Sequence, residues 1–176
     1  MTEPAFVERS RYYLSYEYPT KIRLSVEKLD DAAIWRRFNE SSNSIGNLLL
    51  HLAGNIRQWI VCGVGEAPGD RNRSAEFSAR TGPPRDELLA LLDLAVRDAD
   101  AVLAGLSEED LARSVKIQGR DTTVIGAVYH VVEHFAMHTG QIIMLAKCFA
   151  PGEVKFYEDA DGIAIPLWGG SEGTRH

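Results

Sequence analysis

Apolar residues recur at helical spacing in four long segments of this chain, and polar or turn-forming residues separate these segments. Such spacing is typical of amphipathic helices that bury one face. We therefore predict four main helices, over Phe6–Leu29, Ser44–Cys62, Arg85–Leu106 and Thr123–Phe149. Pro19 lies inside the first helix and predicts a kink or a break there, because proline lacks the backbone N–H and its ring clashes with the preceding turn.

Two connections between these helices carry interpretable signals. Residues 30–43 contain a short turn around Ile34, followed by a polar cluster that favours a helix cap near Ser44. The segment Gly65–Pro84 has no usable period and contains several glycines and prolines, so we predict a long loop there. Loops of this length are uncommon unless they are functional or disordered.

The segments on either side of the last helix have weaker patterns. Ser114–Ile117 alternates and Gln118–Asp121 is turn-like, so we predict a short hairpin or an extended crossover before that helix. Beyond Pro151 the chain is interrupted by glycines, and we predict an extended or irregular tail that packs through its aromatic and aliphatic residues.

The composition limits the class of protein. With 176 residues, 45% of them hydrophobic and 25% charged, the chain fits one domain that builds a core without disulfide bonds. The net charge of −6 and the pI near 5.4 argue against nucleic acid as a partner, because phosphate binding needs a concentrated basic surface. No apolar run reaches the length of a membrane span, and residues 1–11 carry charges where a secretion signal needs an apolar stretch. We therefore expect a cytoplasmic protein with no membrane partner.

Histidines provide the candidate chemistry. His51 lies in the second predicted helix, and His130, His134 and His138 follow one another at four-residue spacing in the fourth. A helix rises ~1.5 Å per residue, so His130 and His138 lie ~12 Å apart along the axis, too far to share one ion with metal–nitrogen bonds of ~2.1 Å. The pair on this helix is therefore His130 with His134 or His134 with His138. A histidine from a neighbouring helix would complete a catalytic-type set of three nitrogens with an open position.

The first of these pairs also reads as HxxEH, the pattern of inverted zinc peptidases, with Glu133 as its acidic member. We set this interpretation aside because such a peptidase needs a larger scaffold and a further acidic ligand downstream. Glu133 also lies ~100° round the helix from His134, and we assign it to the surroundings of the site or to the solvated surface.

Two sequence phrases resemble a known family. Residues 43–55, NSIGNLLLHLAGN, followed by residues 134–142, HFAMHTGQI, are similar in order and spacing to the DinB/YfiT-like superfamily of metal-dependent enzymes, and more closely to a DinB-like branch without an assigned reaction. The resemblance covers about residues 6–150. It implies an all-α four-helix bundle with a long crossover connection, a divalent metal held by His51, His134 and His138, and a homodimer. His130 lies outside the pattern. We expect one domain over 1–176, with its core at about 6–150 and its tail at 151–176.

Polar residues near these histidines are candidates for supporting the metal or lining a pocket. Asn47, Asn55 and Gln58 share a helix face with His51, and buried amides need hydrogen-bond partners. The set of candidates for this outer layer or pocket is Asn47, Asn55, Gln58, His130, Glu133 and Gln141. Arg57, Arg71 and Arg73 are candidates for binding an anionic substrate or belong to the solvated surface.

Three neutral imidazoles leave a divalent ion its full charge. Zinc is the default ion, and imidazole also suits nickel, iron and copper. Such an ion lowers the pKa of bound water from about 15.7 towards ~7 and activates a bound thiol in the same way. We therefore predict a metal-dependent enzyme that hydrolyses a small-molecule substrate or transfers a low-molecular-weight thiol. The alternatives are a non-catalytic, stress-related dimeric bundle in which the metal joins two helices, and a metal-free interaction module.

Overall fold

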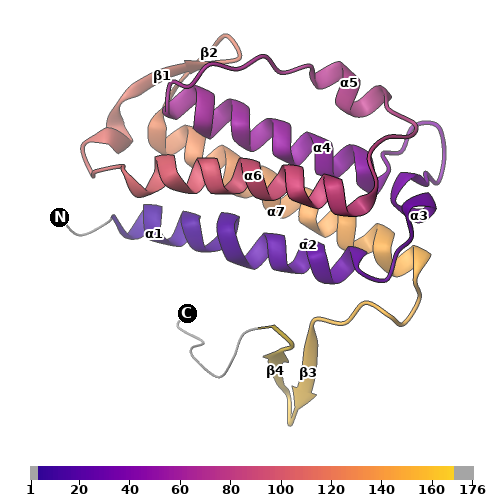
Figure 1. Cartoon of the computed structure of the whole chain (residues 1–176). Coiled ribbons are helices and arrows are strands. Elements are labelled where there is room, and N and C mark those ends of the chain that lie inside the picture. Colours follow the sequence, from indigo (N-terminus) through magenta and orange to yellow (C-terminus); the bar gives the residue numbers. More distant parts are fainter. Residues whose placement is uncertain (1–3, 169–176) are drawn as a thin grey trace.

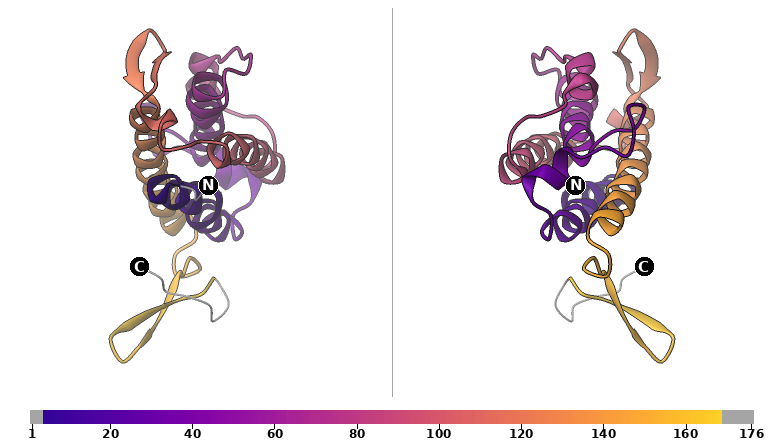
Figure 2. Two further views of the ribbon diagram at one scale, coloured as in Figure 1. Left: turned by 90° about the vertical axis from the view of Figure 1, so that its left-hand side faces the viewer. Right: turned by 90° about the vertical axis from the view of Figure 1, so that its right-hand side faces the viewer.

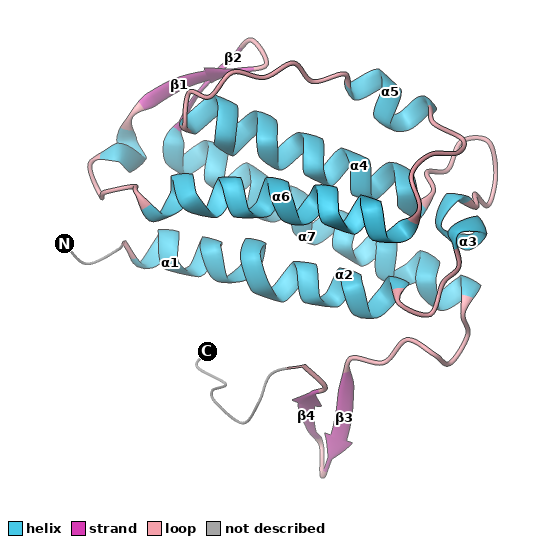
Figure 3. Ribbon diagram, viewed as in Figure 1, coloured by secondary structure: helices cyan, strands magenta, loops and turns pink. Residues whose placement is uncertain are grey.

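The computed structural model describes residues 4–168, so residues 1–3 and the end of the predicted tail, 169–176, lie outside it. Helices dominate the molecule (Figure 3), and the predicted all-α bundle is confirmed. The first long helix consists of α1 (Ala5–Tyr12), the π-helical segment η1 (Tyr13–Glu17) and α2 (Tyr18–Val26). No break occurs at Pro19. The π-helical turn immediately before it shifts the backbone bonding pattern, so the helix continues past the missing N–H.

The second long helix joins α4 (Ile45–Ile56) to the π-helical segment η2 (Arg57–Val64), and we call the two together the α4–η2 helix. Its start is set locally, as predicted. Ser44 accepts a hydrogen bond from the backbone of Asn47, and the Asn47 side chain accepts one from the backbone N–H of Ser44, which forms a capping box. This cap fixes where the helix carrying His51 begins.

The other two long helices are α6 (Arg85–Ala104) and α7 (Val124–Phe149), and Thr123 caps α7. Short elements link the long ones: α3 (Asp31–Trp35) precedes α4, and the 3₁₀ turn η3 (Asp110–Ala112) follows α6. Both α6 and α7 contact the first helix and the α4–η2 helix, so the first two helices of the sequence lie diagonally opposite each other. Fully buried apolar side chains from all four helices meet in the core, among them Ile22, Leu52, Leu88 and Phe135.

The helices α4 and α6 are neighbours that run in the same direction, so the chain must return along the bundle between them. Residues 65–84 make this crossover connection along the length of the bundle (Figure 1). The prediction of a long loop over Gly65–Pro84 is incomplete in one respect. The crossover contains the short helix α5 (Arg73–Ser78), capped by Asn72. Six residues are too few to show a helical period in the sequence.

Two hairpins complete the described chain. The predicted hairpin before α7 is present as β1 (Ser114–Ile117) and β2 (Arg120–Thr123), joined by two residues with positive φ, Gln118 and Gly119. The tail, expected to be extended or irregular, contains a second hairpin, β3 (Tyr157–Ala160) and β4 (Ile163–Pro166), which projects from the bundle (Figure 2). Acidic residues in β3 obscure its strand pattern.

Within residues 4–168, no helix has both the length and the apolar character needed to cross a membrane.

Candidate metal centre

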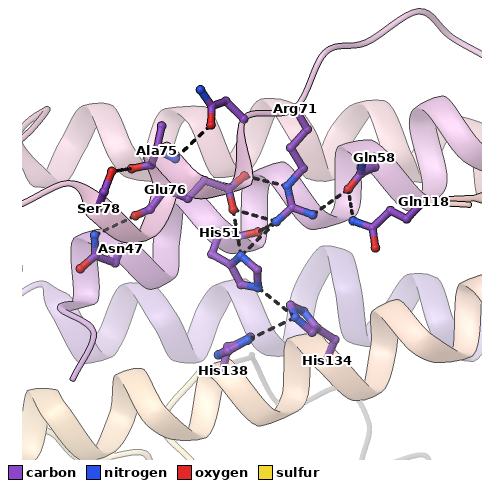
Figure 4. A network of polar contacts seen from close by, with 11 residues as sticks. Asn47, His51, Gln58, Arg71, Ala75, Glu76, Ser78, Gln118, His134 and His138 are labelled. Carbon is purple, nitrogen blue, oxygen red and sulfur yellow. Dashed lines mark hydrogen bonds and ion pairs between the residues drawn. The ribbon is translucent and has the colours of Figure 1, made fainter. Parts of the chain in front are cut away.

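Three histidines from two helices converge in the bundle. His51 projects from α4, and His134 and His138 project from α7 towards it (Figure 4). The Nε2 atom of His134 lies 3.1 Å from Nε2 of His51 and 3.2 Å from Nε2 of His138. Three nitrogens bound at ~2.1 Å to one ion would lie about 2.9 to 3.4 Å apart, depending on the coordination geometry. The spacing therefore suits a single divalent ion.

The outer nitrogen of His51 is held by a buried ion pair. Its Nδ1 atom lies 2.9 Å from a carboxylate oxygen of Glu76, and Arg71 binds the same carboxylate through two nitrogens, at 2.7 and 2.8 Å. Arg71 Nη2 also lies 3.0 Å from His51 Nδ1, but it donates to Glu76 and to the His51 carbonyl oxygen. The proton on His51 Nδ1 therefore points at the carboxylate, and the Nε2 lone pair points at the other histidines.

Both members of this ion pair come from the crossover and lie over α4. Glu76 is 9% exposed, and only 7% of the Arg71 side chain is exposed. Burial would raise the pKa of Glu76, but the hydrogen bonds from Arg71 and His51 outweigh it and hold that pKa below the ordinary value. Gly54 provides the space, because a Cβ atom there would lie 2.3 Å from Glu76 Oε1. The carboxylate is thus charged at neutral pH and directed at His51.

The two histidines of α7 differ from His51 in the hydrogen-bond partners of their Nδ1 atoms. His138 Nδ1 donates to Gln141 Oε1 at 2.7 Å, which leaves its Nε2 lone pair free. Burial lowers the pKa of His138 although the Gln141 hydrogen bond raises it. His134 Nδ1 is buried and has no hydrogen-bond partner among the described residues. Burial, reinforced by the neighbouring His138 and His51, lowers the pKa of His134 to about 3. Both rings are therefore neutral at pH 7, the form that binds metals.

His130 lies outside this cluster. Its ring packs on Trp59, with the ring centroids 4.1 Å apart, and its centroid lies 5.5 Å from that of His134. Within residues 4–168, the group of ligand-type side chains whose donor atoms lie within 4.8 Å of one another consists of His51, His134 and His138. Of the two pairs that the sequence allowed on α7, the one that meets His51 is His134 with His138.

The structure places the other sequence candidates at varied distances from the cluster. Gln141 contacts His138 directly, as described above. Asn47 donates to the backbone oxygen atoms of Glu76 and Ala79, and so holds the crossover. Gln58 accepts from Arg71 Nη1 at 2.9 Å. Asn55 is buried with its Oδ1 unpartnered among the described residues, whereas Glu133 is exposed.

The arginines that sequence analysis offered for an anionic substrate have separate roles. Arg71 is engaged by Glu76. Arg57 lies 3.3 Å from Asp98 on the surface, and Arg73 packs over the ring of Phe77 at 4.8 Å.

Sequence reasoning missed Glu76 altogether. The nearest signal is Gly54, one turn beyond His51, where a helix would ordinarily favour a larger residue.

A family model for a protein of unknown function, DUF1572, matches residues 5–159 of the chain. The chain belongs to the DUF1572 family. A search of curated proteins found no significant match. The solved structures that share the fold of this DUF1572 protein include the three that follow.

A conserved protein from Enterococcus faecalis is 13% identical with a TM-score of 0.68, over 80% of this chain and 94% of that one. The DinB-like protein YjoA from Bacillus subtilis is 22% identical with a TM-score of 0.63, over 88% and 98%. YfiT from Bacillus subtilis, described as a probable metal-dependent hydrolase with an unusual four-helix bundle topology, is 19% identical with a TM-score of 0.66, over 81% and 87%. These likenesses show that the chain has the four-helix-bundle fold that the resemblance to the DinB/YfiT-like superfamily implies.

Proposed function

We propose that this DUF1572 protein is a metal-dependent enzyme that acts on a small molecule, with a divalent ion held by His51, His134 and His138. The observation that carries the proposal is the convergence of three imidazoles, in which Nε2 of His134 lies 3.1 Å from Nε2 of His51 and 3.2 Å from Nε2 of His138. No fourth histidine, cysteine or carboxylate within residues 4–168 joins the group. Three protein nitrogens with an open position are typical of catalytic rather than structural zinc sites.

The chain contributes to this chemistry by fixing the three rings. Glu76 accepts the Nδ1 proton of His51, and Gln141 accepts that of His138, so both Nε2 lone pairs face the same point. Burial keeps His134 neutral. A divalent ion, when bound, supplies Lewis acidity that brings the pKa of a water or thiol on it towards neutrality. YfiT is described as a probable metal-dependent hydrolase, and this description supports hydrolysis as the reaction. Transfer of a low-molecular-weight thiol would use the same Lewis acidity of the ion.

We further propose zinc as the native ion, since imidazole ligands suit it and three histidines with an open fourth position form a known catalytic zinc site. A homodimer is our proposal for the assembly.

The test is elemental analysis of untagged protein, followed by activity screens of the metallated form. We expect about one divalent ion per chain and its loss in His134→Ala, while His130→Ala, a matched change on the same helix outside the cluster, retains it. The metallated protein is then assayed against simple esters and amides and against thiol adducts. Turnover of the first group supports hydrolysis, and turnover of the second supports thiol transfer.

Two outcomes contradict the proposal. Retention of one ion per chain in His134→Ala would show that the ligand set is wrong. A silent substrate panel, combined with a sharp fall in melting temperature on chelation, would favour a non-catalytic bundle in which the ion joins α4 to α7.

A further inference from the structure

A cavity of about 430 Å³ borders the Arg71–Glu76 pair and is lined by none of the three histidines. Its walls come from the α4–η2 helix, from residues 69–72 and Glu76 of the crossover, and from the β1–β2 hairpin at residues 116–118. This size suits a small organic ligand. The cavity therefore lies next to the candidate metal centre but has a lining of its own.

The lining is rich in hydrogen-bond donors. Gln58 Oε1 already accepts from both Arg71 and Gln118, so its remaining polar group is the Nε2 donor. Asn72 Oδ1 is occupied in capping α5, which leaves its Nδ2 donor. Neither donor has a partner among the described residues. A ligand that offers several acceptor oxygens would satisfy both.

The charges at the cavity favour an anion. Arg71 and Glu76 neutralise each other within the wall. Lys116 is exposed and makes no ion pair within the described part of the chain, and Arg57 has only a long, exposed contact with Asp98 at 3.3 Å. Exposed pairs of this kind contribute little, so the Arg57 guanidinium is available to a ligand. Asp70 is the remaining charged group of the lining, and it would accept a hydroxyl or amino group of the same ligand.

Two glycines let the walls approach closely. A Cβ atom on Gly63 would lie 2.5 Å from Ile117 Cδ1, and one on Gly69 would lie 2.5 Å from Cys62 Sγ. The hairpin and the crossover therefore pack directly against the α4–η2 helix. Ile117 and Cys62 provide an apolar surface within the same cavity.

We propose that this cavity binds a small organic anion, a carboxylate or a phosphate. Lys116 and Arg57 attract its charge, Gln58 and Asn72 donate to its oxygens, and its carbon skeleton lies against Ile117. The proposal depends on the cavity alone and holds whether or not the neighbouring histidines bind a catalytic metal.

The test is isothermal titration of metal-free protein, prepared with a chelator, at constant ionic strength. The probes are succinate and glycerol phosphate, with succinamide as the neutral analogue of succinate. We expect saturable binding of at least one anion and none of succinamide. Lys116→Gln and Arg57→Gln should each weaken it about tenfold, the effect of losing a charged hydrogen bond of ~1.4 kcal/mol. Lys155→Gln, which changes an exposed lysine outside the cavity, should leave it unchanged.

The comparison of the two anions distinguishes a carboxylate site from a phosphate site. Binding of succinamide as tight as that of succinate would overturn the proposal, and so would unchanged affinity in both cavity variants. Anion binding that occurs only after metal is restored would also overturn it, because the anion would then be a ligand of the metal. Absence of a catalytic metal, by contrast, would refute the proposed function and leave this site intact.

Discussion

The two helices that supply the candidate ligands support their histidines in different ways. On α7, His138 is held by Gln141, three residues further along the same helix. On α4, His51 is held by Glu76, 25 residues away on the crossover, which is in turn bound by Arg71. The α7 half of the site is thus complete once one helix forms. The α4 half is complete only when the crossover has packed over it.

The supporting groups also differ in charge. A carboxylate bonded to the outer nitrogen of a metal-binding histidine stabilises positive charge on that ring, whereas an amide oxygen offers a weaker, neutral acceptor. Burial of the Glu76–Arg71 pair increases this difference because water screens it less. We therefore expect metal affinity to depend more on the distant carboxylate than on the local amide.

The largest effect should follow from removing a ligand on either side. His51→Ala and His138→Ala should each lose stoichiometric metal, because two imidazoles hold a divalent ion far more weakly than three. Elemental analysis after dialysis measures this loss. If one of the two variants kept a full equivalent of metal, the site would not be shared between the helices.

The next effect compares Glu76 with Gln141, the two side chains that bind the outer nitrogens of His51 and His138. Glu76→Gln should weaken metal affinity about 10- to 100-fold, the usual consequence of losing a carboxylate behind a metal-bound histidine. Gln141→Ala removes a neutral hydrogen bond and should weaken it only about three- to tenfold. Competition with a chromophoric chelator gives both values. Glu133→Gln, an exposed carboxylate on α7, is the control and should have no effect. A larger loss of metal affinity in Gln141→Ala than in Glu76→Gln would refute the claim that the distant carboxylate matters more than the local amide.

A pair of glycine substitutions tests the same difference between α4 and α7 by changing the room beside the helix rather than the charge of a side chain. Gly54→Ala on α4 places a Cβ atom 2.3 Å from Glu76 Oε1, so we expect displaced Glu76, about tenfold weaker metal binding and a lower melting temperature. Gly140→Ala on α7 meets nothing within 4 Å and should raise stability by ~0.5 to 1 kcal/mol through helix propensity. Thermal denaturation with and without metal checks both. Equal melting temperatures of the two variants, with and without metal, would mean that Glu76 of the crossover does not pack closely against α4 at Gly54.

The last effect concerns the pH dependence of the metal-free protein. Burial lowers the pKa of His134 to about 3 from its ordinary value of 6.5, so between these values the unfolded chain binds a proton that the folded protein excludes. Stability should fall as the pH drops from 6.5 towards 3, and His134→Gln should flatten that fall.

Glu76 contributes in a lower window. Its folded pKa lies below the ordinary value of 4.5, so its stabilising effect is present above 4.5 and is lost as the pH falls through the folded pKa. Glu76→Gln should therefore lower stability throughout the range above pH 4.5 and change the slope of stability against pH only at the acid end. Melting temperatures at a series of pH values separate the two contributions, and a flat profile for the wild type would contradict both.

Much of the α7 half could be predicted because its information is local. Apolar spacing predicts the helix, Thr123 caps it, and the i, i+4 relation of His134 and His138 places both rings on one face. The spacing alone did not decide whether His130 or His138 pairs with His134. The resemblance to the DinB/YfiT-like superfamily made that choice. The structure separates them, since the His130 ring packs on Trp59 while the His138 nitrogen faces His134.

By itself, the sequence determined the four long helices and the cap at Ser44, and its resemblance to a known family selected the three histidines proposed as ligands. The helices and this cap depend on contacts within a turn or two of helix. Only the tertiary structure decided that α5 forms in the crossover and that its Glu76, with Arg71, is buried against His51. The physical reason is that a six-residue helix has no period of its own. A carboxylate is buried only where a distant arginine and a histidine pair with it, and where a glycine leaves room for them.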